Sequence, residues 1–107
     1  MDLNSSLTNG TNIEEYSFNT SSDVTEDSYT VQHTGWAMLY YSFKNEEFSQ
    51  FSLYINSVNV LGYNISSGNS TLGGTGVIPL YLQKGDIISI YYYSRYRMDR
   101  LNLRVRY

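Results

Sequence analysis

Two segments of this chain alternate in a way that leaves neither side polar, and this limits how the chain can fold. In residues 36–43 and 87–93, successive side chains point to opposite faces of an extended strand, and both faces are rich in apolar or aromatic groups. A strand of this kind must be covered twice, once by its own core and once by something else. The sequence therefore predicts that these two strands form an inner sheet with a partner beyond it.

Residues 77–83 and 86–93 are predicted to pair as a hairpin. Alternating residues lead up to Gln83, and the tripeptide Lys84-Gly85-Asp86 then breaks the alternation. Gly85 is free to take the positive φ that a tight turn demands. In the second strand, Ile88, Ile90 and Tyr92 are expected on the core side.

In other segments apolar and polar residues alternate, so that only one side of the predicted strand is apolar. Residues 50–56 are expected to point Phe51, Leu53 and Ile55 inward and to keep a solvated outer face, and residues 101–107 place Leu101, Leu103 and Val105 on one face. Turn signals recur every 8–12 residues or so, the spacing typical of a sandwich or barrel. We expect residues 1–23 to be a flexible leader with at most a weak strand at 13–18, and residues 24–107 to form one domain.

Composition supports an all-β fold and excludes several functions. The chain has 107 residues, no cysteine, and 12 tyrosines with 4 phenylalanines and 1 tryptophan. The net charge is −3, so nucleic acid is a poor partner. The apolar runs are too short for a membrane helix, and the N-terminus lacks the pattern of a signal peptide, so we expect neither.

Three stretches resemble one family of proteins when they are taken in order. They are the approach to a Gly-aromatic strand start, a strand-turn-strand around Asn56, and the segment around Lys84-Gly85-Asp86, which correspond to Tyr29–Trp36, Leu53–Val60 and Leu80–Ile88. Together they resemble the jelly-roll domains that end bacteriophage tail and head fibres, which are similar to C1q/TNF-like modules. The chain departs from the pattern at Ser57, where the family has glycine. The resemblance implies an antiparallel β-sandwich of the jelly-roll type with about eight strands.

The resemblance also implies a function, which is a homotrimeric fibre or spike head at the virion surface. Such a head binds a host-surface receptor, a glycan or a protein, without catalysis, and contacts other virion proteins through its N-terminus. The neighbouring subunits then cover the second apolar face, and the predicted trimer interface is Trp36, Met38, Tyr40, Tyr91 and Tyr93. Two alternatives remain open, which are a purely structural capsid-decoration or fibre-assembly module and a secreted TNF/C1q-like ligand.

The candidate receptor-binding residues lie after the last tyrosine of the 87–93 strand. Arg95, Tyr96 and Arg97 combine rigid aromatic area with charged tips, a combination that suits recognition, and the Gly/Ser-rich residues 66–76 are a second candidate. Farther along, Arg104 and Arg106 share one face of the final strand. They are interpreted as partners of the acidic N-terminal residues in a neighbouring subunit, with a basic surface for anionic glycans as the alternative.

Neither catalysis nor a bound cofactor is predicted. The single histidine, His33, lies beside a glycine bend and has no second histidine or cysteine with which to bind a metal, so we interpret it as an exposed loop residue. Asp86 is interpreted as capping its own turn rather than binding calcium. No nucleophile lies beside a general base, so we expect no enzyme activity, no cofactor and no metal.

Overall fold

The computed structural model describes residues 11–21, 24–43, 50–60, 65–66, 75–92 and 98–107. Within these residues the chain forms nine strands and no helix. The strands are β1 (Ile13–Ser17), β2 (Glu26–Thr30), β3 (Gly35–Phe43), β4 (Gln50–Ile55), β5 (Val58–Asn59), β6 (Ile65–Ser66), β7 (Thr75–Leu82), β8 (Ile87–Tyr92) and β9 (Met98–Arg106).

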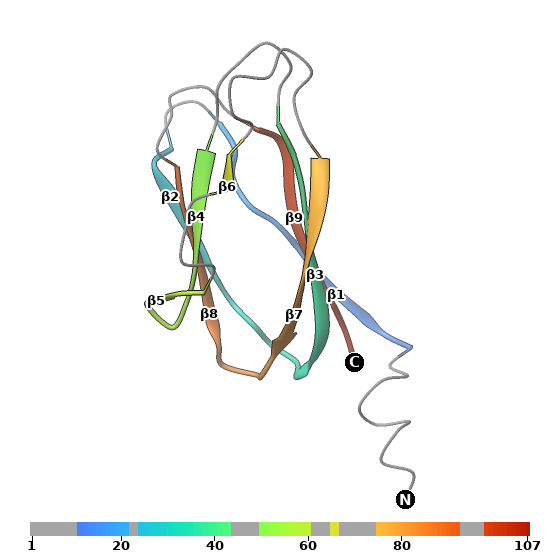
Figure 1. The fold of residues 1–107 in the computed structure, drawn as a ribbon. Helices are drawn as coiled ribbons and strands as arrows, with labels where there is room; N and C mark the ends of the chain where they lie inside the picture. The colour runs from blue at the N-terminus through green and yellow to red at the C-terminus, as the bar shows by residue number, and fades with distance from the viewer. Residues whose placement is uncertain (1–10, 22–23, 44–49, 61–64, 67–74, 93–97) are drawn as a thin grey trace, which may run out of the picture.

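The strands form two antiparallel sheets that pack face to face (Figure 1). The four-stranded sheet has the order β1-β9-β3-β7, and the five-stranded sheet has the order β2-β8-β4-β5 with β6 also paired to β4. Each sheet therefore takes strands from both halves of the chain. This order is that of a jelly roll, so the predicted fold class is confirmed.

The predicted hairpin between β7 and β8 is wrong. β7 pairs with β3, whereas β8 pairs with β2 and β4, so the turn between them carries the chain from one sheet to the other. Asp86 N–H donates to the Gln83 carbonyl at 2.9 Å, and Gly85 has a φ of 95°. The Asp86 carboxylate accepts the Gln83 N–H at 2.8 Å, so this side chain caps the turn, as predicted.

The turn at Asn56 is the hairpin that the sequence predicts. Residues 56 and 57 have φ values of 52° and 68°, and β4 pairs with β5 across them. Positive φ at both central residues is the geometry of a type I′ turn, which favours Asn followed by Gly. The Asn56 side chain also accepts the Ile87 N–H and donates to Asp86, both within 3.0 Å. Asn56 thereby joins this hairpin to the beginning of β8.

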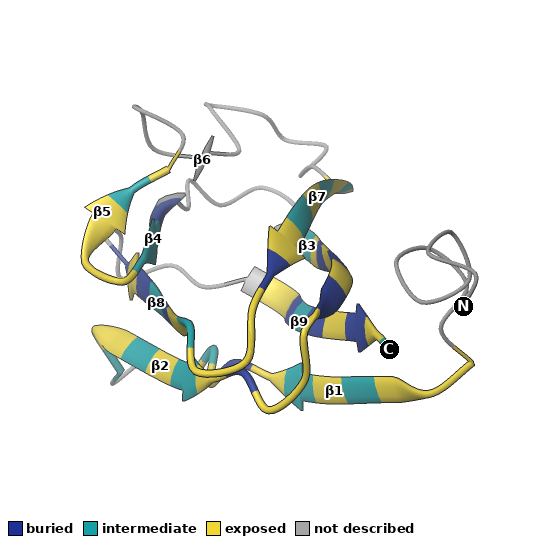
Figure 2. Ribbon diagram, turned by 90° about the horizontal axis from the view of Figure 1, so that it is seen from below, coloured by how far each residue is buried: buried dark blue, intermediate teal, exposed yellow. Residues whose placement is uncertain are grey.

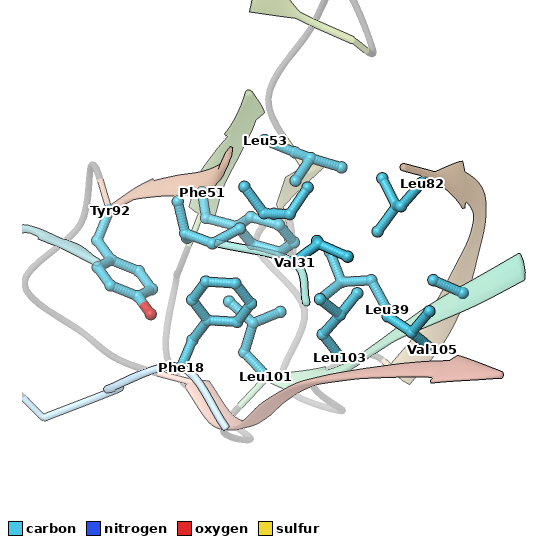
Figure 3. Close-up of a cluster of buried hydrophobic side chains, with 13 residues drawn as sticks. Phe18, Val31, Leu39, Phe51, Leu53, Leu82, Tyr92, Leu101, Leu103 and Val105 are labelled. Atoms are coloured by element: carbon cyan, nitrogen blue, oxygen red, sulfur yellow. The ribbon is translucent and has the colours of Figure 1, made fainter. Parts of the chain in front are cut away.

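The core lies between the sheets and follows the predicted alternation (Figure 3). Buried side chains come from both sheets and from the segments that lead into them, and they are Phe18, Val31, Ala37, Leu39, Phe51, Leu53, Leu82, Ile88, Ile90, Tyr92, Leu101, Leu103 and Val105. Seen along the strands, buried and exposed residues alternate (Figure 2). One expectation fails locally, because Ser52 on the outer side of β4 is buried rather than solvated.

The prediction that the two strands with two apolar sides form one inner sheet is wrong. β3 is a central strand of the four-stranded sheet, between β9 and β7, and β8 is a central strand of the five-stranded sheet, between β2 and β4. Their core-facing sides meet across the sandwich, and their outer sides point away from each other. An apolar second side therefore belongs to each sheet separately.

The N-terminal strand is part of the sandwich. β1 pairs along its whole length with β9, from Ile13 opposite Arg106 to Ser17 opposite Asn102, and Phe18 is buried in the core. Residues 13–18 therefore pack with the jelly roll and not ahead of it, which places the beginning of the folded unit before residue 24. Residues 1–10 of the expected leader lie outside the described residues.

Candidate functional site

The outer face of the four-stranded sheet carries exposed apolar side chains from β1, β3 and β7, and those of the neighbouring strands β3 and β7 are continuous. We call this set the aromatic face, and it consists of Ile13, Trp36, Met38, Tyr40, Val77 and Tyr81. The strand register places Trp36 opposite Tyr81 and Tyr40 opposite Val77. The Trp36 and Tyr81 rings meet edge to face with centroids 5.3 Å apart, and Trp36 is 48% exposed. Contiguous exposed apolar area of this kind marks an interaction surface.

Arginines from β9 lie between Ile13 of β1 and the β3 part of the aromatic face. Arg104 lies opposite Met38 and Arg106 opposite Trp36, and together with Ile13 and Tyr40 they line a groove of about 220 Å³. The Arg104 guanidinium carbon lies 5.6 Å from the centre of the Tyr40 ring. The groove therefore combines aromatic walls with a positive rim.

The outer face of the five-stranded sheet is more polar. Ile87 and Tyr91 are exposed on β8, and the register places hydroxyl and acidic side chains of β2 and β4 beside them, while the Tyr91 ring meets the Tyr54 ring of β4 edge to face at 5.2 Å. Ser28 and Ser89 hydroxyls lie 3.0 Å apart in the middle of this face. The two exposed apolar residues on β8 are thus separated by polar groups and form no continuous patch.

The predicted trimer-interface residues therefore lie on two opposite surfaces. Trp36, Met38 and Tyr40 lie together on the aromatic face, whereas Tyr91 lies on the outer face of the other sheet. A single flat interface does not contain both groups. Tyr93 lies outside the described residues, as do all three predicted receptor-binding residues, Arg95, Tyr96 and Arg97, and most of the 66–76 segment.

Arg104 does not need another subunit for its acidic partner. Arg104 Nε donates to Glu15 Oε2 at 2.8 Å, across the β1–β9 pair of the same chain. Both side chains are about half exposed, so this ion pair contributes little to stability. The interpretation of Arg104 as a partner of an acidic residue is confirmed, but the pair forms within one chain.

Glu14 points away from the aromatic face and is the centre of a polar cluster. Its side chain is only 7% exposed and accepts hydrogen bonds from the Tyr29 hydroxyl and from the Gln32 N–H at 2.9 Å, while His33 Nδ1 lies 3.2 Å from its other oxygen. Burial alone raises the pKa of Glu14, but these hydrogen bonds outweigh it, and the pKa lies below its ordinary value. No residue pattern around the Glu14-Glu15 pair distinguishes the buried glutamate from the exposed one.

Aromatic stacking completes this cluster. The His33 ring is exposed, as predicted, and stacks on Tyr107 with centroids 3.6 Å apart, while Tyr29 stacks on Tyr16 at 4.3 Å. Burial and the Glu14 carboxylate raise the pKa of Tyr29 to about 12. Burial and the Asp27 carboxylate, which accepts the Tyr16 hydroxyl at 2.8 Å, raise the pKa of Tyr16. These contacts connect β1 to β2, which are edge strands of the two sheets. The cluster therefore has a structural role, and we call it the clasp between the two sheets.

A second hollow lies at the end of the four-stranded sheet opposite the Gln83–Asp86 turn. This end pocket has a volume of about 420 Å³ and is lined by Tyr40, Tyr41, Ser42, Thr75, Gly76, Asp99 and Arg100. Its lining comes from the last residues of β3 and the first residues of β7 and β9. The lining combines aromatic rings, hydroxyls, one carboxylate and one guanidinium, which suits a small polar ligand.

In the part of the chain that the structure describes, no group of three or more His, Cys, Asp or Glu side chains is arranged to hold a metal ion. In the same residues, no helix is long and apolar enough to span a membrane.

Comparisons with known proteins bear on the fold. By sequence, neither a protein-family model nor a curated protein matches the chain. Among solved structures, a β-glucosidase from Paenibacillus barengoltzii matches with a TM-score of 0.58 and 11% identity, over 84% of this chain and 10% of that protein. The chain thus spans about a tenth of that enzyme.

Two smaller proteins match over most of their own length. Rabbit GITRL has a TM-score of 0.52 and 13% identity, over 75% of this chain and 70% of that chain. A family 35 carbohydrate-binding module from Paenibacillus barcinonensis has a TM-score of 0.51 and 14% identity, over 84% of this chain and 97% of that chain. The chain is a jelly roll. At these identities the likeness shows the fold alone, and the bacteriophage part of the sequence resemblance stays a prediction.

Proposed function

We propose that this chain is a non-catalytic recognition head that works as a homotrimer and binds glycan at a host surface. The observation that carries the proposal is the aromatic face, which exposes Trp36, Met38 and Tyr40 beside apolar residues of β7. A domain of 107 residues has little stability to spare, and burial of such a face between copies adds to it.

The geometry supports the choice of face, and the motif resemblance supports the number of copies. In a three-fold ring each subunit offers two different patches, and a broad sheet face that points to the axis supplies both. Trimeric presentation also multiplies weak contacts with a multivalent surface. The place of the head on a virion fibre rests on the motif resemblance. The glycan ligand is supported by the carbohydrate-binding module that shares the fold.

Light scattering coupled to size-exclusion chromatography tests the assembly. At micromolar concentration we expect a mass three times the 12.3 kDa of one chain. The variant Trp36→Glu places a charge on the aromatic face and should run as a monomer. Ile87→Glu is the matched control, because Ile87 is exposed to a similar extent, 45% against 48%, on the opposite sheet.

A monomeric wild-type chain would contradict the assembly, and so would dissociation of Ile87→Glu but not of Trp36→Glu. A second candidate function then gains weight, in which the aromatic face itself is the carbohydrate platform of a monomer. The groove between Trp36 and the β9 arginines favours that candidate. Its signature is a monomer whose binding on a glycan array disappears in Trp36→Ala and persists in Tyr91→Ala.

A further inference from the structure

The end pocket is built by an irregularity in the strand register. Along most of β3 and β9 the residues pair one to one, down to Ser42 opposite Arg100, but Phe43 then pairs with Met98. Asp99 is left without a partner on β3, which is the pattern of a β-bulge. Bulges redirect side chains and are common beside functional sites. Here the bulge brings two adjacent charged residues, Asp99 and Arg100, to the same pocket.

A glycine shapes the opposite wall. A Cβ atom added at Gly76 would collide with the phenol of Tyr41, which lies across β7 at this point. The Tyr41 ring also meets the buried Phe51 ring at 5.9 Å, edge to face. The absence of a side chain at Gly76 therefore allows a fixed aromatic ring to line the pocket beside Tyr40.

The charged pair is available to a ligand. Within the described part of the chain, Asp99 and Arg100 form no ion pair with each other and no side-chain hydrogen bond with another residue. A carboxylate accepts hydrogen bonds and a guanidinium donates them, while Ser42 and Thr75 hydroxyls do both. Two neighbouring sugar hydroxyls need this combination of donors and acceptors, and the apolar side of a sugar ring needs an aromatic wall.

We infer that the end pocket binds a neutral saccharide, with Asp99 and Arg100 bonded to adjacent hydroxyls. The pocket volume of about 420 Å³ lies in the range of roughly 300–1,000 Å³ that is usual for small-molecule sites. An acidic sugar fits less well, because its carboxylate faces Asp99 as well as Arg100. This inference rests on the proposed recognition role and names its site and ligand class. Tyr40 belongs to both the end pocket and the aromatic face, whereas the other lining residues lie at the end of the sheet, so a trimer that meets at Trp36 and Met38 can leave the pocket open.

Nuclear magnetic resonance titration tests the inference with defined probes. The methyl glycosides of glucose, galactose, mannose and N-acetylglucosamine are added to the full chain, with glucuronic acid as the acidic comparison. We expect at least one neutral glycoside to shift the amide signals of Thr75, Gly76, Asp99 and Arg100 in a saturable way. Glucuronic acid should bind more weakly than that glycoside.

Charge-removing variants inside the pocket and at the opposite end of the sandwich provide the mutational test. Arg100→Gln should weaken binding about tenfold or more, and Asp99→Asn should do the same, because each removes a charge-assisted hydrogen bond. Lys84→Gln removes a positive charge from the exposed Gln83–Asp86 turn, at the opposite end of the sandwich, and should leave affinity within about twofold. Failure of every neutral glycoside to bind, unchanged binding by Arg100→Gln, tighter binding of glucuronic acid, or shifts centred on Trp36 would each overturn the inference. Light scattering on the same sample reports the assembly separately, so failure of the pocket and failure of the trimer are distinguished.

Discussion

Adjacent glutamates on β1 allow a sharp test of the clasp between the two sheets. Glu14 is nearly buried and receives hydrogen bonds from Tyr29 and Gln32, whereas Glu15 is about half exposed and paired with Arg104. The same substitution, Glu to Gln, can therefore be made one residue apart, on opposite sides of one strand. We expect Glu14→Gln to destabilise the fold and Glu15→Gln to leave it nearly unchanged.

The contacts set the expected magnitudes. A hydrogen bond to a charged group contributes about 1.5–3 kcal/mol net, and the half-buried Tyr29 hydroxyl loses such a partner in Glu14→Ala. The other groups that donate to Glu14 can bond to water instead, so the loss of their hydrogen bonds costs less. We therefore expect Glu14→Ala to lower the free energy of unfolding by about 2–3 kcal/mol. Glutamine keeps one acceptor oxygen, so about 1 kcal/mol is expected for Glu14→Gln. An exposed ion pair contributes at most about 0.5–1 kcal/mol, so Glu15→Gln should destabilise the fold by no more than that.

Urea unfolding followed by tryptophan fluorescence measures these differences, at one fixed protein concentration because an oligomer makes stability concentration-dependent. The pH dependence gives a second readout. The folded pKa of Glu14 lies below its ordinary value of 4.5, so its stabilising contribution is present above pH 4.5 and is lost as the pH falls through the lower, folded pKa. The gap between wild type and Glu14→Gln should therefore shrink on acidification. A gap that stays constant with pH, or an equal loss in Glu15→Gln, would refute the reasoning.

Three further predictions concern single residues of the framework. The hydrogen bond of the Tyr29 hydroxyl stabilises the fold fully below pH 10, and this contribution is lost as the pH rises toward about 12. Tyr29→Phe should therefore lose less stability than wild type over that pH range, which urea midpoints measure. Ser57→Gly should stabilise the hairpin by up to about 1 kcal/mol in thermal unfolding, since Ser57 has a φ of 68°, and a lower melting temperature would contradict the turn assignment. Gly35→Ala should cost about 1–3 kcal/mol, because the added Cβ collides with the Arg106 carbonyl on β9, and an unchanged urea midpoint would count against that close approach.

The sequence predicted which way residues point better than which strands pair. Alternation correctly assigned Phe51 and Leu53 of β4 and Ile88 and Ile90 of β8 to the core. It could not assign neighbours, because the alternation within a strand is the same whichever strand lies beside it. The turn at Gly85 shows the limit, since a glycine with positive φ serves a connection between two sheets as well as a hairpin.

The candidate sites were less accessible from the sequence. The bulge at Asp99 depends on how β9 pairs with β3, and nothing in the residues around it marks a register shift. Glu14 reads as a surface charge beside Glu15, and its burial depends on Tyr29, which lies 15 residues away on a strand of the other sheet. Both features arise from long-range pairing, which local residue patterns do not record.

The apolar second side of β3 and that of β8 lead to different conclusions once the neighbours are known. On β3, Trp36 and Tyr40 lie opposite Tyr81 and Val77, so the apolar surface continues from strand to strand. On β8, Tyr91 lies between Glu26 and a serine and meets the half-buried Tyr54 ring of β4 edge to face with centroids 5.2 Å apart, so its aromatic contact adjoins a carboxylate. A contact between subunits gains from a continuous apolar area and loses where it must dehydrate a carboxylate. Of the residues that the sequence proposed for one interface, those on β3 therefore remain as a surface for self-association, and Tyr91 belongs to the polar exterior of the opposite sheet.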